Sequence, residues 1–328
     1  MSAAPTGAPA PLLLAGAGGP GEGPGDPGAG GDGGETFLYP EAEALLEALR
    51  AKGFLLSLNT NGTLLDQRRL DWLAELRPAK VNLSLYGASN AGYARLCGCP
   101  DGFDRVRAAV DGLLERGLNV YLNGTITREN RAELSGMAAF AKARGLTLHS
   151  TAYLFPAGRY GLRACPSRLS PEEAAAATLE LERLQLGEET FLANCAAQAA
   201  RLAAGVPGGF QGGEDCGRSN CLGGRNSFAV SWDGALMPCV SNPGLRFSLA
   251  SRSLAEAWSL LRAAVEALPL PADCGRCPWR GVCNACPATL YNETGAYDRL
   301  ADYPCAYVRA AAEARLAVLA EAARKEGA

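Results

Sequence analysis

The sequence predicts an α/β fold in which parallel βα units of barrel type are followed by a small cysteine-rich region and a C-terminal helix. Strand-like runs alternate with helical stretches through the first half of the chain, which is the pattern of βα units. Eight of the twelve cysteines fall between residues 216 and 305. With 328 residues, the chain is long enough for two domains and for a core that needs no disulfides.

Composition and charge limit the partners of the protein. Hydrophobic residues make up 48% of the chain and charged residues make up 20%. The net charge of -3 does not indicate a basic surface that binds nucleic acid. No apolar run approaches the roughly 18 residues of a membrane span, so we expect no membrane partner and a cytoplasmic location. Because thiols stay reduced there, the cysteines indicate metal ligation, redox chemistry or buried small side chains, with disulfides the weaker alternative.

Residues 1–34 are expected to be disordered. They contain 12 Gly and 6 Pro, with no basic and no aromatic residue. Such a segment buries too little apolar surface to offset the entropy lost on ordering. A folded domain is predicted from Glu35 onward, beginning with an amphipathic helix near 40–52 that starts at a proline and ends before Gly53.

The first folded domain is predicted to span residues 35–165. Parallel strands are expected at 54–60, 80–85, 118–126 and 146–155, separated by helices near 64–76, 103–116 and 129–144. The carboxyl ends of parallel strands carry the chemistry in barrels of this kind. Polar residues gather there, namely Asn59, Asn61, Ser84, Asn123 and Thr125.

Three further segments complete the predicted organisation. A helical linker is expected over 166–210, and its helix, near 170–204, starts in the capping-box sequence SPEE. A cysteine-rich domain is expected over 211–306. A C-terminal helix is expected over 307–328.

The cysteine spacing predicts two sites of four thiolates each. The sequence reads Cys216-x4-Cys221-x17-Cys239, then, after 34 residues, Cys274-x2-Cys277-x5-Cys283-x2-Cys286, and, after 18 more, Cys305. Thiolates suit zinc and iron-sulfur clusters alike. A structural zinc usually takes two short pairs, whereas single cysteines at 239 and 305 must complete these sites from a distance, which favours the larger clusters.

A family resemblance follows from these motifs. The stretch CLGGRNSFAVSWDGALMPC, followed by CGRCPWRGVCNAC and a last cysteine, resembles the SPASM domain, the two-cluster C-terminal extension of radical S-adenosylmethionine (SAM) enzymes. The family spacing is kept except before Cys286, where two residues replace the usual three. The resemblance implies two [4Fe-4S] clusters. The first would be held by Cys216, Cys221, Cys239 and Cys286, and the second by Cys274, Cys277, Cys283 and Cys305.

The barrel half carries a second resemblance. The stretch GGETFLYPEAEALLEALRAKGFLLSLNTNG is similar to the part of radical SAM enzymes in which a GGE loop is followed by a helix and a strand ending in NTNG. By this resemblance, Gly33 and Gly34 let the backbone approach the methionine end of SAM, and Glu35 accepts from its amino group. The fold is then an incomplete parallel (β/α) barrel of the radical SAM type, with about four of six strands.

Other strand ends match the same family. The stretch KVNLSLYGASNAGYARLCG resembles the fourth strand and its loop, where Ser84 and Arg95 match positions that engage the SAM carboxylate. Asn59, Asn123 and the LFPAGR stretch (154–159) would lie near the ribose and adenine. The residues alone leave a structural alternative open, because Asn59 can belong to an ordinary turn, Ser84 can satisfy a backbone group, and Arg95 can be a solvated charge.

One part of the family pattern is missing. Radical SAM chemistry uses a third cluster held by a CxxxCxxC loop, whereas no cysteine precedes Cys97 here. The pair Cys97 and Cys99 lies in another loop, and we expect it to be structural, as we do Cys165 and Cys195. Either the sequence is an incomplete or frame-shifted reading of a normal enzyme, or it is a degenerate homologue. An open barrel would expose the edge of the 54–60 strand.

The resemblance implies a protein that modifies a peptide or protein, since intact relatives abstract hydrogen with a 5′-deoxyadenosyl radical made from SAM. Without the CxxxCxxC loop, this chain is expected not to cleave SAM. One alternative is a non-catalytic iron-sulfur electron-transfer or peptide-recognition module that partners a complete enzyme, and another is a zinc-only structural protein. We expect an electron donor such as a ferredoxin or flavodoxin. His149, the only histidine, is predicted to be a strand residue rather than a base.

Overall fold

The computed structural model describes residues 12–14, 35–154, 165–205, 221–242, 244–283 and 286–326. The chain divides into two compact units. Unit 1 comprises Met1–Gly124 and Ala143–His149, and unit 2 comprises Thr125–Lys142 and Ser150–Ala328. The division falls inside the segment 35–165 that the sequence predicts as one domain.

A parallel sheet forms the centre of unit 1. Its strands follow chain order, namely β1 (Leu12–Leu14), β2 (Leu56–Thr60), β3 (Lys80–Ser84), β4 (Val120–Thr125) and β5 (Leu148–Thr151). The pairs from β1 to β4 are parallel. Strands β2 to β5 fall on the four runs predicted from the sequence, which confirms the α/β class, and β1 makes the sheet five-stranded.

Strand β1 differs from the prediction for the N-terminal segment. Leu12–Leu14 pair with Leu56–Leu58 of β2, so the 54–60 strand is not a free edge as expected. The backbone N–H and C=O groups at the edge of β2 can pair with any extended segment, and three residues are enough to form such a pair. The other residues of 1–34 lie outside the described part of the chain.

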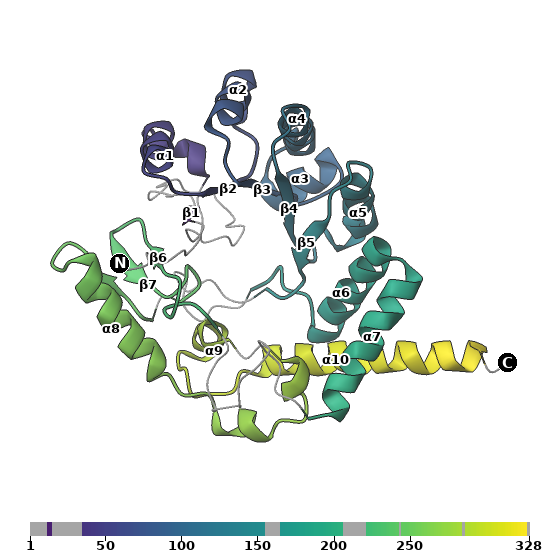
Figure 1. Ribbon diagram of the computed structural model, residues 1–328. Helices are drawn as coiled ribbons and strands as arrows, with labels where there is room; N and C mark the ends of the chain where they lie inside the picture. The colour runs from purple at the N-terminus through teal and green to yellow at the C-terminus, as the bar shows by residue number, and fades with distance from the viewer. Residues whose placement is uncertain are drawn as a thin grey trace, which may run out of the picture. The chain divides into compact units, whose positions relative to one another are not determined.

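Helices cover the apolar face of this sheet, outside the strands in Figure 1. They are η1 (Thr36–Leu38), α1 (Ala42–Ala51), α2 (Gln67–Leu76), α3 (Asn90–Cys97) and α4 (Gly102–Glu115). Their buried leucines, including Leu46, Leu73 and Leu113, pack as part of the same core as Leu58 and Leu83 of the strands. Helices α2 and α4 approach closely, since a Cβ at Gly112 would lie 2.6 Å from Leu70 Cδ1.

Unit 2 begins with helices η2 (Arg131–Glu133) and α5 (Leu134–Lys142). The predicted helix over 170–204 is divided at Gly187 into α6 (Pro171–Leu186) and α7 (Glu188–Ala203). Gly187 has a φ of 77°, which a glycine adopts readily and which ends the first helix. The predicted capping box is present, with Ser170 and Glu173 bonded reciprocally.

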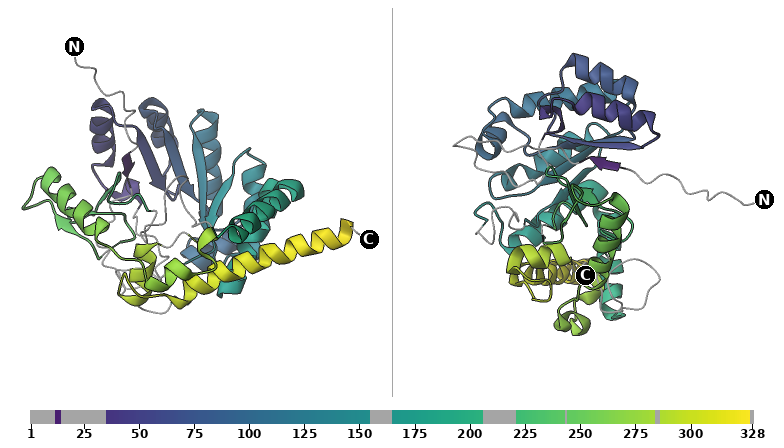
Figure 2. Two further views of the ribbon diagram at one scale, coloured as in Figure 1. Left: turned by 60° about the horizontal axis from the view of Figure 1, so that its bottom comes forward. Right: turned by 90° about the vertical axis from the view of Figure 1, so that its left-hand side faces the viewer.

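The C-terminal helix α10 (Asp302–Glu326) lies beside α6 and α7 (Figures 1 and 2). Buried Leu179, Phe191 and Cys195 pack against Val318 and Leu319 of α10. These helices therefore have a hydrophobic core of their own.

The cysteine-rich part of unit 2 contains short elements. An antiparallel sheet is formed by β6 (Ala229–Val230), β7 (Ala235–Met237) and β8 (Phe247–Ser248), and the helices are α8 (Leu254–Glu266), η4 (Ala272–Arg276), η5 (Arg280–Val282) and α9 (Pro287–Thr294). A small core joins Leu236 of β7 to Leu261 and Val265 of α8. Among the described residues, no helix has the length and apolar character needed to cross a membrane.

Candidate functional sites

The sheet of unit 1 has one apolar and one polar face. Leu58 pairs with Val81, and Asn59 pairs with Asn82 one residue later. Because side chains alternate along a strand, the register gives one face of leucine and valine and another of polar residues. The polar face carries Ser57, Asn59, Asn82, Ser84, Tyr121 and Asn123.

Three predicted SAM contacts share this face. Ser84 is in register with Asn123, and Asn59 lies on the neighbouring strand β2. All three are close to the carboxyl ends of their strands, where ligands of parallel α/β folds bind. Their placement is compatible with the predicted contacts and does not test them.

Asn82 was not predicted as a site residue. Its Nδ2 donates to Asn59 Oδ1 at 2.8 Å and to Ser57 Oγ at 3.0 Å. It therefore fixes the orientation of the Asn59 amide. The sequence indicates this residue through its position, because Asn82 lies two residues before Ser84 in the same predicted strand and so shares a face with it.

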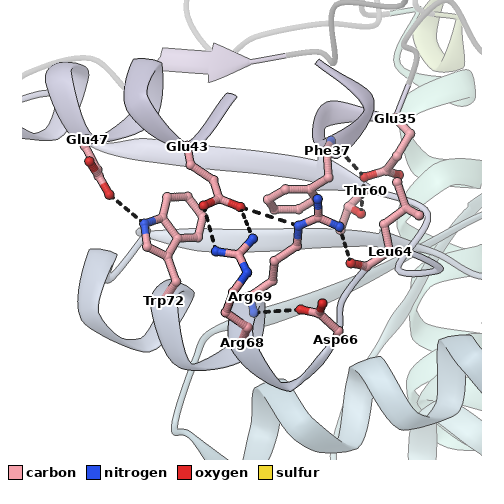
Figure 3. Close-up of polar contacts among 10 residues, drawn as sticks. All are labelled: Glu35, Phe37, Glu43, Glu47, Thr60, Leu64, Asp66, Arg68, Arg69 and Trp72. Atoms are coloured by element: carbon pink, nitrogen blue, oxygen red, sulfur yellow. Dashed lines mark hydrogen bonds and ion pairs between the residues drawn. The ribbon is translucent and has the colours of Figure 1, made fainter. Parts of the chain in front are cut away.

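Glu35 is buried and joins the predicted GGE loop to the end of β2 (Figure 3). Its carboxylate accepts from Thr60 Oγ1 at 2.7 Å, from the backbone N–H of Asn61 at 2.6 Å and from the N–H of Phe37 at 3.3 Å. These bonds give Glu35 a structural role. Its predicted contact with the SAM amino group stays a prediction, and Gly33 and Gly34 lie outside the described residues.

Arg95 is exposed in the last turn of α3, and its predicted contact with the SAM carboxylate stays a prediction. The loop between Ser84 and α3 is held by Tyr93, whose hydroxyl accepts from the N–H of Tyr86 at 3.1 Å and donates to the Ser84 carbonyl oxygen at 3.5 Å. Burial raises the pKa of Tyr93, so the phenol remains a neutral donor. Tyr93 thus joins α3 to the residues that follow β3.

The cysteines predicted as structural lie in different surroundings. Cys195 is fully buried in the core between α6, α7 and α10. Cys99 donates its thiol to Asp101 Oδ1 at 3.4 Å, next to Cys97. His149 stacks on Tyr121 with 5.6 Å between ring centroids. None of these residues touches the polar pair Ser84 and Asn123 through a described hydrogen bond.

The first predicted cluster set comes together around a cavity. Cys221, Cys239 and Cys286 line it, together with Arg225 and Asn242 and with Gly223, Pro238, Val265, Leu268, Pro287 and Ala288. Burial raises the pKa of Cys239 to about 11, and the neighbouring thiols of Cys286 and Cys221 add to this rise. The fourth member, Cys216, lies outside the described residues.

The second predicted set also forms a group. The pKa of Cys274 is raised by burial and by its neighbours Cys283, Cys305 and Cys277. The pKa of Cys305 is raised by burial and by Cys283 and Cys277. The four thiols of this set therefore lie close enough to influence one another, and their role as ligands of one cluster stays a prediction.

The donor chemistry fits iron-sulfur ligation. Both sets consist of thiols, which are the ligands of such clusters. Within the described ranges, no three His, Cys, Asp or Glu side chains gather tightly enough to hold a single metal ion. Gly223 allows the backbone to approach closely at the first set, since a Cβ there would lie 2.9 Å from the Pro238 carbonyl oxygen and 3.3 Å from Cys221 Sγ.

Comparisons with known proteins show which proteins the chain is similar to. Residues 32–141 match the family model of the Radical SAM superfamily. An AdoMet-dependent heme synthase of Methanosarcina barkeri is 25% identical over 283 residues, which are 81% of this chain and 78% of that protein. The PqqA peptide cyclase of Gluconobacter oxydans is 30% identical over 159 residues, which are 47% of this chain and 44% of that protein.

Solved structures show a similar fold. The enzyme anSMEcpe with bound AdoMet has a TM-score of 0.63 and 18% identity, covering 89% of this chain and 80% of that one. Streptococcus suis SuiB bound to the precursor peptide SuiA has a TM-score of 0.61 and 15% identity, covering 83% of this chain and 64% of that one. Residues 32–141 are therefore similar to the Radical SAM superfamily, and the chain resembles these solved structures in fold.

Proposed function

We propose that the protein is a radical SAM and SPASM-type protein that holds two [4Fe-4S] clusters and acts on a peptide or protein substrate. The observation that supports the proposal is that three cysteines of the first set line one cavity, while the four cysteines of the second set lie close enough to influence one another. The polar face of the unit 1 sheet supports the same class, because it presents amide and hydroxyl groups at the strand ends.

The residues have distinct parts in this proposal. Cys216, Cys221, Cys239 and Cys286 hold the first cluster, and Cys274, Cys277, Cys283 and Cys305 hold the second. Such clusters supply one-electron transfer when bound. Glu35 and Asn82 fix the end of β2, so that Asn59 keeps its orientation on the polar face beside Ser84 and Asn123. Gly33, Gly34 and Arg95 complete the proposed SAM contacts.

SAM cleavage is not expected from this chain by itself. The 328 residues contain no CxxxCxxC motif for a third cluster. We therefore infer that the two clusters relay electrons or bind substrate, and that a ferredoxin or flavodoxin in the cytoplasm reduces them. If a complete radical SAM enzyme is the physiological partner, this chain acts as its electron-transfer or peptide-recognition module.

A peptide substrate is supported by the structural neighbours. Both anSMEcpe and SuiB have been solved with peptides bound, and the PqqA cyclase is named for a peptide. A tetrapyrrole substrate is the second candidate, because heme synthases of three organisms match 81% to 84% of this chain. These two substrates differ in absorption, which gives a direct test.

Iron and sulfide content, with an absorption spectrum after anaerobic reconstitution, tests the cluster proposal. We expect about eight irons and eight sulfides per chain and no 5′-deoxyadenosine from added SAM. Zinc without iron overturns the proposal. About twelve irons, or 5′-deoxyadenosine production, overturns the expected inactivity.

The substrate is tested with the reconstituted protein. Binding of a tetrapyrrole shifts its intense visible absorption, whereas binding of a precursor peptide changes the EPR spectrum of a reduced cluster without such a band. Tight tetrapyrrole binding without peptide binding would replace the peptide proposal by the second candidate.

A further inference from the structure

The loop that follows Cys221 contacts the thiol of that cysteine through its backbone. Gly223 donates its backbone N–H to Cys221 Sγ at 3.3 Å. Gly224 has a φ of +77° and donates to the Ser227 carbonyl oxygen at 2.7 Å, and a Cβ at Gly224 would lie 2.5 Å from Val265 Cγ2. Both glycines therefore occupy positions where a side chain would displace its neighbours.

Arg225 connects this loop to the end of α8. Its Nε donates to Glu266 Oε1 at 3.1 Å, and its Nη1 donates to the carbonyl oxygen of Cys221 at 3.2 Å. The Arg225 side chain is 25% exposed and lines the same cavity as Cys221, Cys239 and Cys286. A fixed positive charge therefore shares the cavity with three thiols of the first set.

We propose that Arg225 is a positioning residue for the first cluster, which holds the backbone of Cys221 in place and raises the reduction potential of that cluster. The inference rests on the proposed two-cluster function. Net charge and hydrogen bonds to sulfur set the potentials of such clusters. Reduction adds negative charge, so a nearby cation stabilises the reduced form, while the Glu266 carboxylate offsets part of this effect.

Opposite substitutions at the ion pair test the role of charge. Arg225→Gln removes the cation, and Glu266→Gln removes the anion that offsets it. Arg246→Gln is the matched control, because Arg246 pairs with Asp233 and does not line the cavity. Each protein is reconstituted anaerobically, its iron is counted, and its clusters are followed by EPR in a redox titration.

The expected shifts have opposite signs. At fixed potential, Arg225→Gln should lower the reduced-to-oxidised ratio of one cluster by about threefold to tenfold, where tenfold is about 59 mV for one electron. Glu266→Gln should raise this ratio. The transition of the second cluster serves as an internal control and should stay in place, and Arg246→Gln should move neither transition.

The outcomes separate this inference from the function on which it rests. Parent protein without about eight irons contradicts the two-cluster function before any variant is compared. With that iron present, an unchanged potential in Arg225→Gln, or shifts of the same sign in both variants, overturns the role of Arg225. If Arg225→Gln loses iron, the variant Arg225→Lys, which keeps the positive charge, is tested next. Restored iron with a potential near that of the parent supports the role of Arg225. Failure of Arg225→Lys to restore iron overturns that role.

Discussion

At the scale of single residues, Glu35 determines how the end of β2 is held. Its carboxylate accepts hydrogen bonds from Phe37, Thr60 and Asn61. One side chain therefore joins the residues before α1 to the end of β2. Hydrogen bonds to a charged group contribute more than bonds between neutral groups. The residues beside the predicted SAM contacts therefore depend on a charge that is satisfied within the protein.

Replacement of Glu35 by glutamine should destabilise the protein. The amide keeps the size of the carboxylate but loses the charge, and its NH2 group faces donors. We expect Glu35→Gln to lower the free energy of unfolding by about 2 kcal/mol, measured by urea denaturation. Glu75→Gln, on the exposed face of α2, is the control and should change it by less than about 0.5 kcal/mol. Equal losses in the two variants would contradict the role of Glu35.

At the scale of elements, α1 and α2 are joined by polar pairs on their outer surfaces (Figure 3). Glu43 of α1 accepts from both terminal nitrogens of Arg68 on α2, at 2.6 and 2.9 Å, and lies 3.5 Å from Arg69 Nε. Glu47 accepts from Trp72 Nε1 at 2.7 Å. The bond from Arg68 holds the pKa of Glu43 below its usual value of 4.5.

This pair should make stability depend on pH. Because the folded pKa of Glu43 is depressed, its contribution is present above the unfolded pKa and is lost as the pH falls through the folded pKa. Glu43→Gln should therefore unfold at slightly lower urea than the parent at neutral pH, and the difference should shrink as the pH falls below 4.5. The effect is small, since Arg68 is largely exposed.

Glu47→Gln is the matched control for the pH experiment. The glutamine oxygen still accepts from Trp72, and the Glu43 pair remains, so the pH dependence should follow that of the parent. A difference between Glu43→Gln and the parent that persists unchanged at low pH would contradict an ionic contribution.

Most elements could be predicted because their signals are local. Strands β2 to β5 and the amphipathic helices follow from hydrophobic period and from turn residues, and the cap at Ser170 follows from SPEE. Strand β1 could not be predicted, because three leucines in a Gly/Pro-rich segment form a strand only through pairing with β2. The division at Gly187 was missed because a helix tolerates a single glycine in many sequences.

At the scale of the whole molecule, the site was predictable where chemistry fixes spacing. Both cysteine sets could be read from residue type and spacing, and their role as cluster ligands stays a prediction. Asn82 and Arg225 act through neighbours brought close by register and by a turn, and neither stands in a motif of its own. Positioning residues of this kind become identifiable only when the distances are known.

The assignment of Cys286 to one of the two proposed clusters can be tested by counting iron in double variants. Its spacing departs from the family pattern, and its thiol neighbours Cys239 of the first set. If Cys286 and Cys221 serve one cluster, the double variant Cys221→Ala with Cys286→Ala should lose that cluster alone and keep about four irons per chain. The double variant Cys286→Ala with Cys305→Ala should lose both clusters and keep almost none.

A Cys97→Ala variant controls for the loss of a thiol outside both sets and should keep about eight irons. Elemental analysis and the number of EPR transitions measure all three proteins. The reverse pattern, with iron abolished in the Cys221 and Cys286 pair but half retained in the Cys286 and Cys305 pair, would assign Cys286 to the second cluster. Arg225 and Asn242 would then line a cavity whose cluster has only Cys216, Cys221 and Cys239 as cysteine ligands, and its fourth iron would be open to substrate.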